Sequence, residues 1–215
     1  MNRREANAAL LAGAVLAALP AAARAEQIRS LGPARRDGGM PLMNALLLRR
    51  SSRAFADRPL PPQLLADLLW AAYGVNRAGG ERTAPCWRHI VAIDVYAAMA
   101  DGLWLYAPGE HALRLRSKQD LRALSGTQDF AATAPLDLIY VAHGERMDGL
   151  APEERRLYAS VDTAFIGQNV YLYCAATGLA TVFRAAIDHA RLKRALQLGD
   201  GQFVTFAQTV GFPAS

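Results

Sequence analysis

A long helical pattern in the C-terminal half constrains the fold more than any other feature of this sequence. It runs from Pro152 to Thr177 and is followed by Gly178. Its first residues, PEERR, are mostly charged, and from Val161 onward apolar residues occupy most faces of the helix. A helix that is apolar nearly all round is buried in a core or against another chain. With proline at its start and glycine at its end, this segment predicts one long, well-delimited helix.

Helical and strand-like segments follow one another irregularly around this helix. Residues 43–50 and 64–73 show helical spacing, with Gly74 as the expected C-cap and Trp70 and Tyr73 on the apolar face. Without a regular alternation of strand and helix, the pattern favours a single α+β domain. Further helices are expected at residues 121–132 and 188–198, and strands at residues 89–99, 136–144, 179–185 and 202–212, with a hairpin over residues 102–116 that turns at Pro108-Gly109.

The N-terminal segment is predicted to be an export signal over residues 1–25. Arg3 and Arg4 precede an apolar stretch over residues 8–19, and the residues around Arg24 offer a small-x-small cleavage site. The paired arginines suggest the twin-arginine route, and an uncleaved anchor helix is the alternative. We therefore expect a periplasmic or otherwise exported protein, or a cytoplasmic one if the signal does not work. A polar leader over residues 26–42 then precedes the domain at residues 43–215.

Composition and charge exclude several classes of function. The chain has 215 residues, of which 52% are hydrophobic, so it can bury one ordinary core. The formal charge is +5, and part of it belongs to the export signal, so the charge does not predict nucleic-acid binding. No metal site is predicted, because the four histidines are scattered without acidic or thiol neighbours at ligand spacing. These histidines are His89, His111, His143 and His189. The two cysteines, Cys86 and Cys174, are expected to be reduced thiols.

Three arginines and two serines lie at the end of the first predicted helix and just beyond it. Arg49, Arg50 and Arg53 surround Ser51 within five positions. Cations at a helix C-terminus complement the macrodipole, which is worth ~0.3–1 kcal/mol each, but this explains neither Ser51 nor Arg53. Guanidinium groups and a hydroxyl that converge on one point are also typical of a phosphate site. On spacing alone both interpretations stay open.

Several motifs in a fixed order resemble the nitroreductase family of FMN flavoproteins. They are LLRRSSRAF, PLPPQLLADLLWAAYGVNR, RTAPC, YASVDTAFIGQNVYLYCAATGLATV and QTVGFP, and together they cover residues 43–213. The resemblance implies a nitroreductase-like α+β fold with a central mixed or antiparallel sheet flanked by helices. It also implies that the long helix lies at the interface of a homodimer, with Gln168 and Asn169 at that interface.

The resemblance also implies a set of cofactor-binding residues. The side chains of Arg49, Ser51 and Arg53 would hold the FMN phosphate and ribityl chain, with Arg50 contributing through its backbone. The backbone after the long helix would lie near the reactive N5 edge of the flavin, and a loop would pass beside the ring. The backbone segment after the long helix comprises Gly178, Leu179, Ala180 and Thr181. The loop beside the ring contributes Pro85, Cys86 and His89.

The loop departs from the family pattern Pro-Ser-x-x-Asn, because it reads Pro85-Cys86-Trp87-Arg88-His89. Arg88 and His89 are candidates to replace the lost hydrogen-bonding groups. Trp87 either forms a wall of the substrate pocket or packs in the core, and Cys86 is expected to be a plain loop or core thiol. Arg184 either contacts flavin or substrate or forms a surface salt bridge.

The implied activity is a two-electron, ping-pong reduction of a nitroaromatic, a quinone or a similar flat acceptor. FMN would be the cofactor and NAD(P)H the electron donor, and the flavin N5 rather than a side chain would carry the chemistry. Relatives that dehydrogenate azoline rings or cleave flavin give one alternative. A flavin- or ligand-binding protein without turnover is an alternative of another class, and a protein that binds no flavin is the last.

Overall fold

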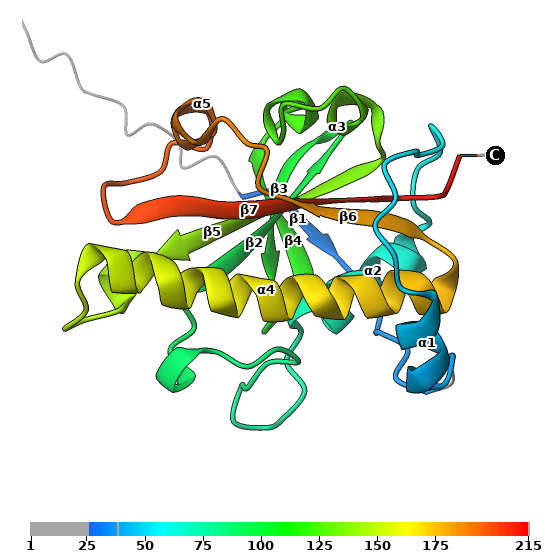
Figure 1. Cartoon of the computed structure of the whole chain (residues 1–215), viewed down its shortest axis with the longest axis horizontal. Helices are drawn as coiled ribbons and strands as arrows, with labels where there is room; N and C mark the ends of the chain where they lie inside the picture. The colour runs from blue at the N-terminus through cyan, green and yellow to red at the C-terminus, as the bar shows by residue number, and fades with distance from the viewer. Residues whose placement is uncertain (1–25, 38, 215) are drawn as a thin grey trace, which may run out of the picture.

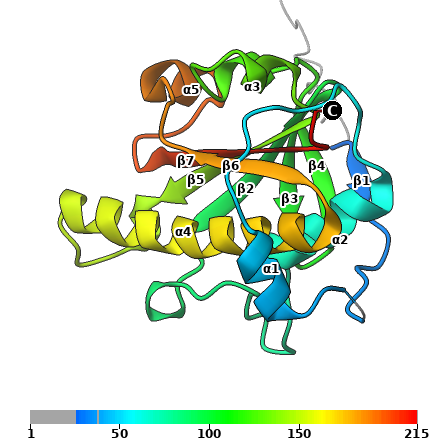
Figure 2. The ribbon, with the colours of Figure 1, turned by 45° about the vertical axis from the view of Figure 1, so that its right-hand side comes forward.

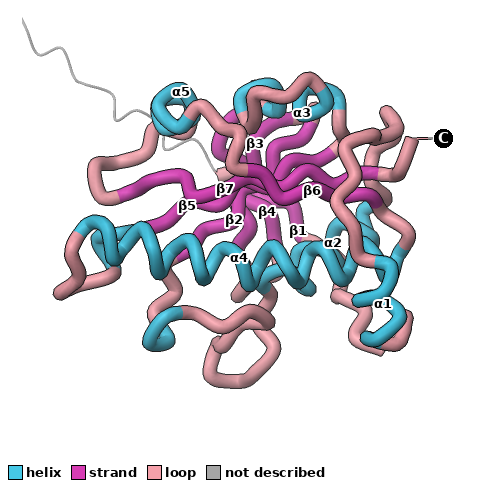
Figure 3. The backbone as a smooth tube through the Cα atoms, viewed as in Figure 1, coloured by secondary structure: helices cyan, strands magenta, loops and turns pink. Residues whose placement is uncertain are grey.

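An antiparallel sheet forms the centre of the computed structural model, which describes residues 26–37 and 39–214 (Figure 1). The predicted export signal lies outside the described residues. The sheet has seven strands in the order β1-β4-β3-β2-β5-β7-β6, and every neighbouring pair is antiparallel. The α+β prediction is confirmed. The strands are β1 Ile28–Ser30, β2 Ile93–Met99, β3 Gly102–Ala107, β4 Ala112–Ser117, β5 Leu136–His143, β6 Ala180–Arg184 and β7 Gln202–Gly211 (Figure 3).

Helices cover both faces of the sheet. The long helix α4, Pro152–Thr177, lies across one face together with α1, Leu42–Leu48, and α2, Pro62–Tyr73 (Figures 1 and 2). The opposite face carries α3, Phe130–Thr133, and α5, His189–Ala195. Three short 3-10 turns, η1 Trp87–His89, η2 Arg122–Leu124 and η3 Gly144–Arg146, complete the structure.

The strands feed two apolar cores because successive side chains point to opposite faces of a sheet. On β2, Val95 packs in the core under α2 and α4, whereas Tyr96 packs in the core under α5. Every residue of β5 is buried, as expected of a central strand covered on both sides. Tyr73 is buried at the end of α2, as predicted, while Trp70 is half-buried and donates its indole N–H to the Val75 carbonyl, 3.1 Å away.

The long helix has the predicted bounds. Gly178 ends it with φ 74°, a left-handed conformation that glycine adopts without cost. One face is buried against the sheet, whereas the other face exposes Leu157, Val161 and Phe165 at 59%, 41% and 45% of their surface. Within the described chain this helix is therefore buried on one side only.

The predicted helix over residues 121–132 is wrong. The segment forms the short turn η2 and then the single-turn helix α3, separated by residues 125–129. Gly126 lies against the buried Arg184, whose Nη1 is 1.8 Å from the position that a Cβ on residue 126 would take. The Thr127 N–H donates to the Ala186 carbonyl instead of to its own segment. Tertiary contacts therefore interrupt a pattern that looks helical in sequence.

The polar segment before α1 is tied into the fold. Its strand β1 pairs with β4 at the edge of the sheet, and Asp67 accepts hydrogen bonds from the backbone N and the Nε of Arg35 at 2.9 and 2.8 Å. The residues that the structure describes include no helix with the length and apolar character needed to span a membrane.

Candidate functional site

The basic cluster lies where the chain leaves α1. Arg49 directly follows this helix and is half-buried, while Arg50, Ser51 and Arg53 are exposed. Over the described residues, none of the three arginines takes part in an ion pair. Three cations without a neutralising carboxylate produce a local positive potential that favours an anion.

Tyr171 on α4 contacts two members of this cluster, Ser51 and Arg49. The Ser51 Oγ and the Tyr171 OH are 2.7 Å apart, and the Tyr171 OH accepts the backbone N–H of Phe183 at 2.9 Å. The Arg49 guanidinium lies over the Tyr171 ring, 5.3 Å from its centroid. If the phenol donates to Ser51, the serine proton is free to donate to an anion. Tyr171 is not among the site residues identified from the sequence. The feature that could have indicated it is a phenol hydroxyl within the apolar half of α4.

The structure brings this cluster together with the turn after α4. The Ser52 N–H donates to the Thr181 carbonyl at 2.9 Å. A cavity of about 230 Å³ lies between the two segments, and Arg50 lines it. Thr181 is buried, and its hydroxyl donates to the Thr209 carbonyl at 2.8 Å. The cavity is also lined by the predicted cofactor residues Gly178, Leu179, Ala180 and Thr181.

The loop with Pro85, Cys86 and His89 lines a different cavity. Its shape depends on Asp162 of α4, whose two carboxylate oxygens accept the Trp87 N–H at 3.0 and 3.1 Å. Burial raises the pKa of Asp162 to about 6, and the bond from Trp87 opposes this shift. Trp87 is half-buried and stacks on Tyr158, with ring centroids 5.3 Å apart.

The same loop carries backbone strain. Arg88 and His89 have φ values of 46° and 61°, in the left-handed region that side chains disfavour. This conformation also explains why β2 starts at Ile93, later than the strand predicted from residue 89. Strained residues cluster at functional sites, so the loop remains a candidate for contact with a ligand. The Cys86 thiol is half-buried and unpaired, and burial raises its pKa, so it is a weak nucleophile.

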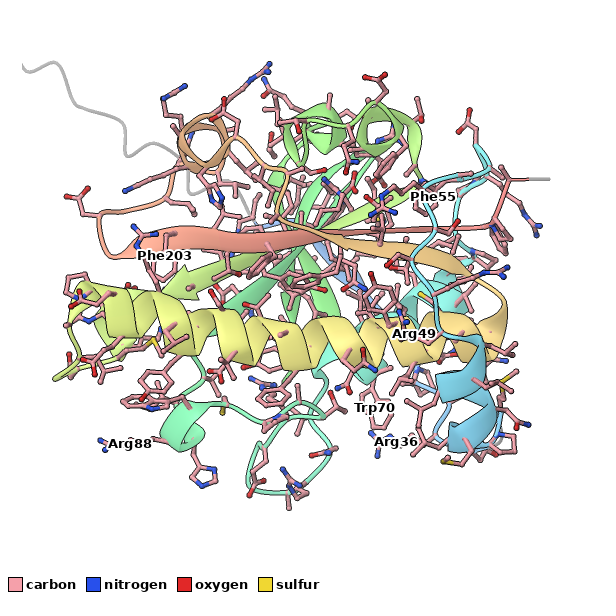
Figure 4. The ribbon with its side chains drawn as sticks, in the orientation of Figure 1. Arg36, Arg49, Phe55, Trp70, Arg88 and Phe203 are labelled. Atoms are coloured by element: carbon pink, nitrogen blue, oxygen red, sulfur yellow. The ribbon has the colours of Figure 1, made fainter. Side chains whose placement is uncertain are left out.

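The basic cluster and this loop do not meet within the single chain that the structure describes. They are anchored on Tyr171 and Asp162, which at about 1.5 Å of rise per residue lie about 14 Å apart along α4. Figure 4 shows Arg49 and Arg88 toward opposite ends of the helix. Gln168 is exposed between them, whereas Asn169 is half-buried and its side chain lies 3.5 Å from the Ala72 carbonyl of α2.

Both interpretations of Arg184 are wrong. Only 3% of this residue is exposed, and its Nη2 donates to Asp137 Oδ1 at 2.7 Å. The Nε donates to the Thr209 hydroxyl and the Nη1 to the Ser125 carbonyl, both at 3.0 Å. All these partners lie inside the protein, so Arg184 faces neither a substrate nor the solvent.

His143 has two acidic neighbours, contrary to the expectation that the histidines have none. Its Nε2 lies 2.9 Å from Asp94 Oδ2, and its Nδ1 lies 2.8 Å from Glu145 Oε1. The hydrogen bond with Asp94 is the main cause of a raised pKa at His143, which burial and Arg146 oppose. In the part of the chain that the structure describes, no group of three or more His, Cys, Asp or Glu residues is arranged to hold a metal ion.

Replacing His143 with glutamine is expected to destabilise the protein more at about pH 5.5 than at about pH 8.5. A histidine whose pKa is raised by folding contributes stability below its unfolded pKa of 6.5, and this is lost as the pH rises through the folded value. Because the two carboxylates are partly exposed, the pH-dependent part is about 1 kcal/mol or less. Urea unfolding at both pH values measures it. Asp94→Asn should shrink the difference, and an H143Q effect independent of pH would contradict the prediction.

Comparison with known proteins identifies the family of this chain. A model of the nitroreductase family matches residues 46–212. The chain belongs to the nitroreductase family. This confirms the resemblance found in the motifs, and it makes the protein an oxidoreductase of a flavin-dependent family. The match begins within α1 and ends just after β7, so it includes both the basic cluster and the loop at Pro85.

Individual proteins resemble the chain in sequence or in fold. A protein of Ralstonia eutropha that carries a provisional nitroreductase name is 42% identical, with a TM-score of 0.84 over 88% of this chain and 91% of its own. A protein of Methanocaldococcus jannaschii, also provisionally named a nitroreductase, is 29% identical over 73% of this chain and 84% of its own. An NADPH:FMN oxidoreductase of Vibrio harveyi is 18% identical, with a TM-score of 0.59 over 81% of this chain and 69% of its own, and shows the fold alone.

Proposed function

We propose that the protein is an FMN-dependent oxidoreductase that transfers two electrons from NAD(P)H to a nitroaromatic, a quinone or a similar flat acceptor by a ping-pong mechanism. The observation that carries the proposal is the basic cluster, Arg49 to Arg53, whose arginines have no acidic partner among the described residues. Arg50 and Ser52 of this segment line the cavity beside the turn after α4, whereas Arg49, Ser51 and Arg53 do not line it. These donors suit a phosphate dianion, because charge-assisted hydrogen bonds fix position as well as charge. FMN, when bound, supplies the redox chemistry.

The chain's own residues bind and orient in this scheme. Arg49, Ser51 and Arg53 would hold the phosphate and ribityl chain, and Tyr171 would hold Ser51 and Arg49 in position. The backbone at residues 178–181 would lie beside the N5 edge of the ring. No side-chain acid or base is required. Asp162, whose pKa is about 6, is engaged by the Trp87 N–H and keeps the loop in shape.

The proposal includes a homodimer, because the two parts of the site are separate in one protomer. Exposed apolar side chains support this assembly, since contiguous apolar surface marks an interface. Leu47 on α1 is 84% exposed and Met43 is 73% exposed. On α4, Phe165 is 45% exposed, next to the exposed Gln168. In the dimer, the loop at Pro85 of one subunit would face the ring held by the basic cluster of the other.

The test is anaerobic stopped-flow mixing of the purified protein with NADH and with NADPH. We expect a yellow protein whose released chromophore runs as FMN, which bleaches on mixing and recovers its colour when a nitroaromatic or quinone is added. A yellow protein that neither donor bleaches would favour the flavin-binding alternative. A colourless protein that takes up no added FMN would overturn the proposal.

Export remains part of the proposal. Arg3, Arg4 and the residues around Arg24 predict it, and N-terminal sequencing of the protein recovered from the periplasm would show whether cleavage follows Ala25.

A further inference from the structure

The loop between α2 and β2 lines a cavity that is separate from the one at the basic cluster. Its volume is about 720 Å³, within the usual range for small-molecule sites. Apolar walls come from Ala84, Pro85 and Val91. The polar and charged side chains that line it belong to Arg77, Glu81, Arg82, Cys86 and His89.

Arg82 has buried donors that nothing in the described chain satisfies. Its Nε and Nη1 are inaccessible to solvent and have no hydrogen-bond partner among the described residues. A buried donor without an acceptor costs the full loss of its hydration, about 1–3 kcal/mol and more when it is charged. The third nitrogen, Nη2, is not among these buried atoms and donates no hydrogen bond within the described residues, so an acceptor in the cavity meets the guanidinium at Nη2. A bound acid group at this position would neutralise the charge that the two buried nitrogens share.

The surrounding backbone holds Arg82 in place. Val75 and Arg82 form an isolated antiparallel bridge, and the Asn76 N–H donates to the Glu81 carbonyl at 3.0 Å. The guanidinium lies 5.5 Å from the centroid of the Tyr73 ring, which is itself buried. A guanidinium fixed in this way loses little side-chain freedom when a ligand binds.

The charge of the cavity wall favours an anion. Glu81 supplies the one carboxylate among the described lining residues, and it lies 3.9 Å from the Arg77 Nε. The Glu81 carboxylate also lies against Gly79, because its Oε2 is 2.8 Å from the position that a Cβ on residue 79 would take. Glu81 therefore faces Arg77 and the loop backbone, and it forms no ion pair with Arg82.

We infer that this cavity recognises a carboxylate on a flat organic electron acceptor, with Arg82 as its charge partner. The inference rests on the proposed function, because the loop at Pro85 and Cys86 that lines the cavity is the one expected beside the flavin ring. The apolar walls contact the body of the acceptor, and Arg82 pairs with its acid group. Arg82 is therefore a residue that determines substrate class.

Two probes that differ only in charge test the inference. Para-nitrobenzoate and para-nitrobenzamide share a ring and a nitro group, and binding to the purified holoprotein is measured calorimetrically without any electron donor. We expect the wild type to bind the benzoate about tenfold more tightly or better, from one charge-assisted hydrogen bond. Arg82→Met should bring the two affinities together, and Arg82→Lys should keep part of the preference. The matched control is Arg116→Gln, which removes a cation on β4.

The outcomes separate this inference from the proposed function. Equal affinities in the wild type, which need no variant, would overturn the inference even if both nitro compounds are reduced. A preference for the benzoate that depends on Arg82 would sustain it even if neither compound is reduced. If Arg82→Met instead changes the ratio of NADPH to NADH affinity and leaves benzoate binding unchanged, the cavity binds a nucleotide phosphate and the carboxylate assignment is wrong.

Discussion

Replacing Arg184 with methionine is expected to lower the free energy of unfolding by about 3–5 kcal/mol at neutral pH. The variant leaves Asp137, which is 0% exposed, without the guanidinium that neutralises it. Burial raises the pKa of Asp137 above its usual value, although Arg184 and Thr209 favour its ionised form. Removing Arg184 raises the pKa of Asp137 further, and protonation at lower pH removes the unpaired charge, so the loss should be smaller near pH 5 than near pH 8. Urea denaturation at the two pH values measures both effects.

Two further variants separate a lost charge partner from lost packing. The double variant Arg184→Met with Asp137→Leu should recover part of the stability, because it removes the unpaired charge as well. Arg191 is an exposed arginine on α5, and Arg191→Met should change the stability by no more than about 0.5 kcal/mol. An R184M protein as stable as the wild type would show that the buried ion pair does not stabilise the fold.

The second large effect concerns the cofactor. Arg49→Ala and Arg53→Ala are each expected to weaken FMN binding by ~1.5–3 kcal/mol, which corresponds to about tenfold to 100-fold, because each removes a charge-assisted hydrogen bond to the phosphate. Fluorescence titration of the apoprotein with FMN measures the dissociation constants. A larger effect is expected at low ionic strength, because both side chains are partly or fully exposed and salt screens them.

Arg58→Ala is the matched control for these variants. It removes an exposed cation a few residues further along the same segment, where the guanidinium lies 4.1 Å from the centroid of the Phe212 ring. We expect no more than about a twofold change in FMN binding, as for a surface residue away from the site. If R49A and R53A bind FMN as tightly as R58A does, the phosphate is held elsewhere.

Sequence patterns predicted most of the fold because local signals and tertiary packing agree there. Proline at the start of α4 and glycine after its end mark bounds that the structure reproduces at Pro152 and Thr177. The hairpin of β3 and β4 turns where Pro108 and Gly109 predict it. The segment over residues 121–132 failed because Gly126 makes room for Arg184, which comes from a strand almost 60 positions later. Local spacing carries no information about such a contact.

The candidate site divides in the same way. Local composition pointed to the basic cluster after α1 and to the glycine turn after α4, and the family motifs assigned both to one cofactor. Only the packing shows that Tyr171 connects the basic cluster, through Ser51, to the strand after the glycine turn, through the backbone of Phe183. The same packing shows that Arg184 belongs to the core. It also shows Arg82 with buried, unpaired nitrogens, which no spacing predicts because the partner groups of a buried donor come from distant segments.

By itself, the order of residues determined the bounds of α4 and of the β3–β4 hairpin, which family the chain belongs to, and which short segments carry the donors for an anion. Those properties depend on neighbours within a few positions, where periodicity, capping and local charge act. Tertiary structure alone decided which charges are buried together, as at Asp137, and which parts of the site lie apart on α4. The reason is physical, because the cost of burying a charge depends on every group that packs around it. Those groups come from distant parts of the sequence and meet only when the chain folds.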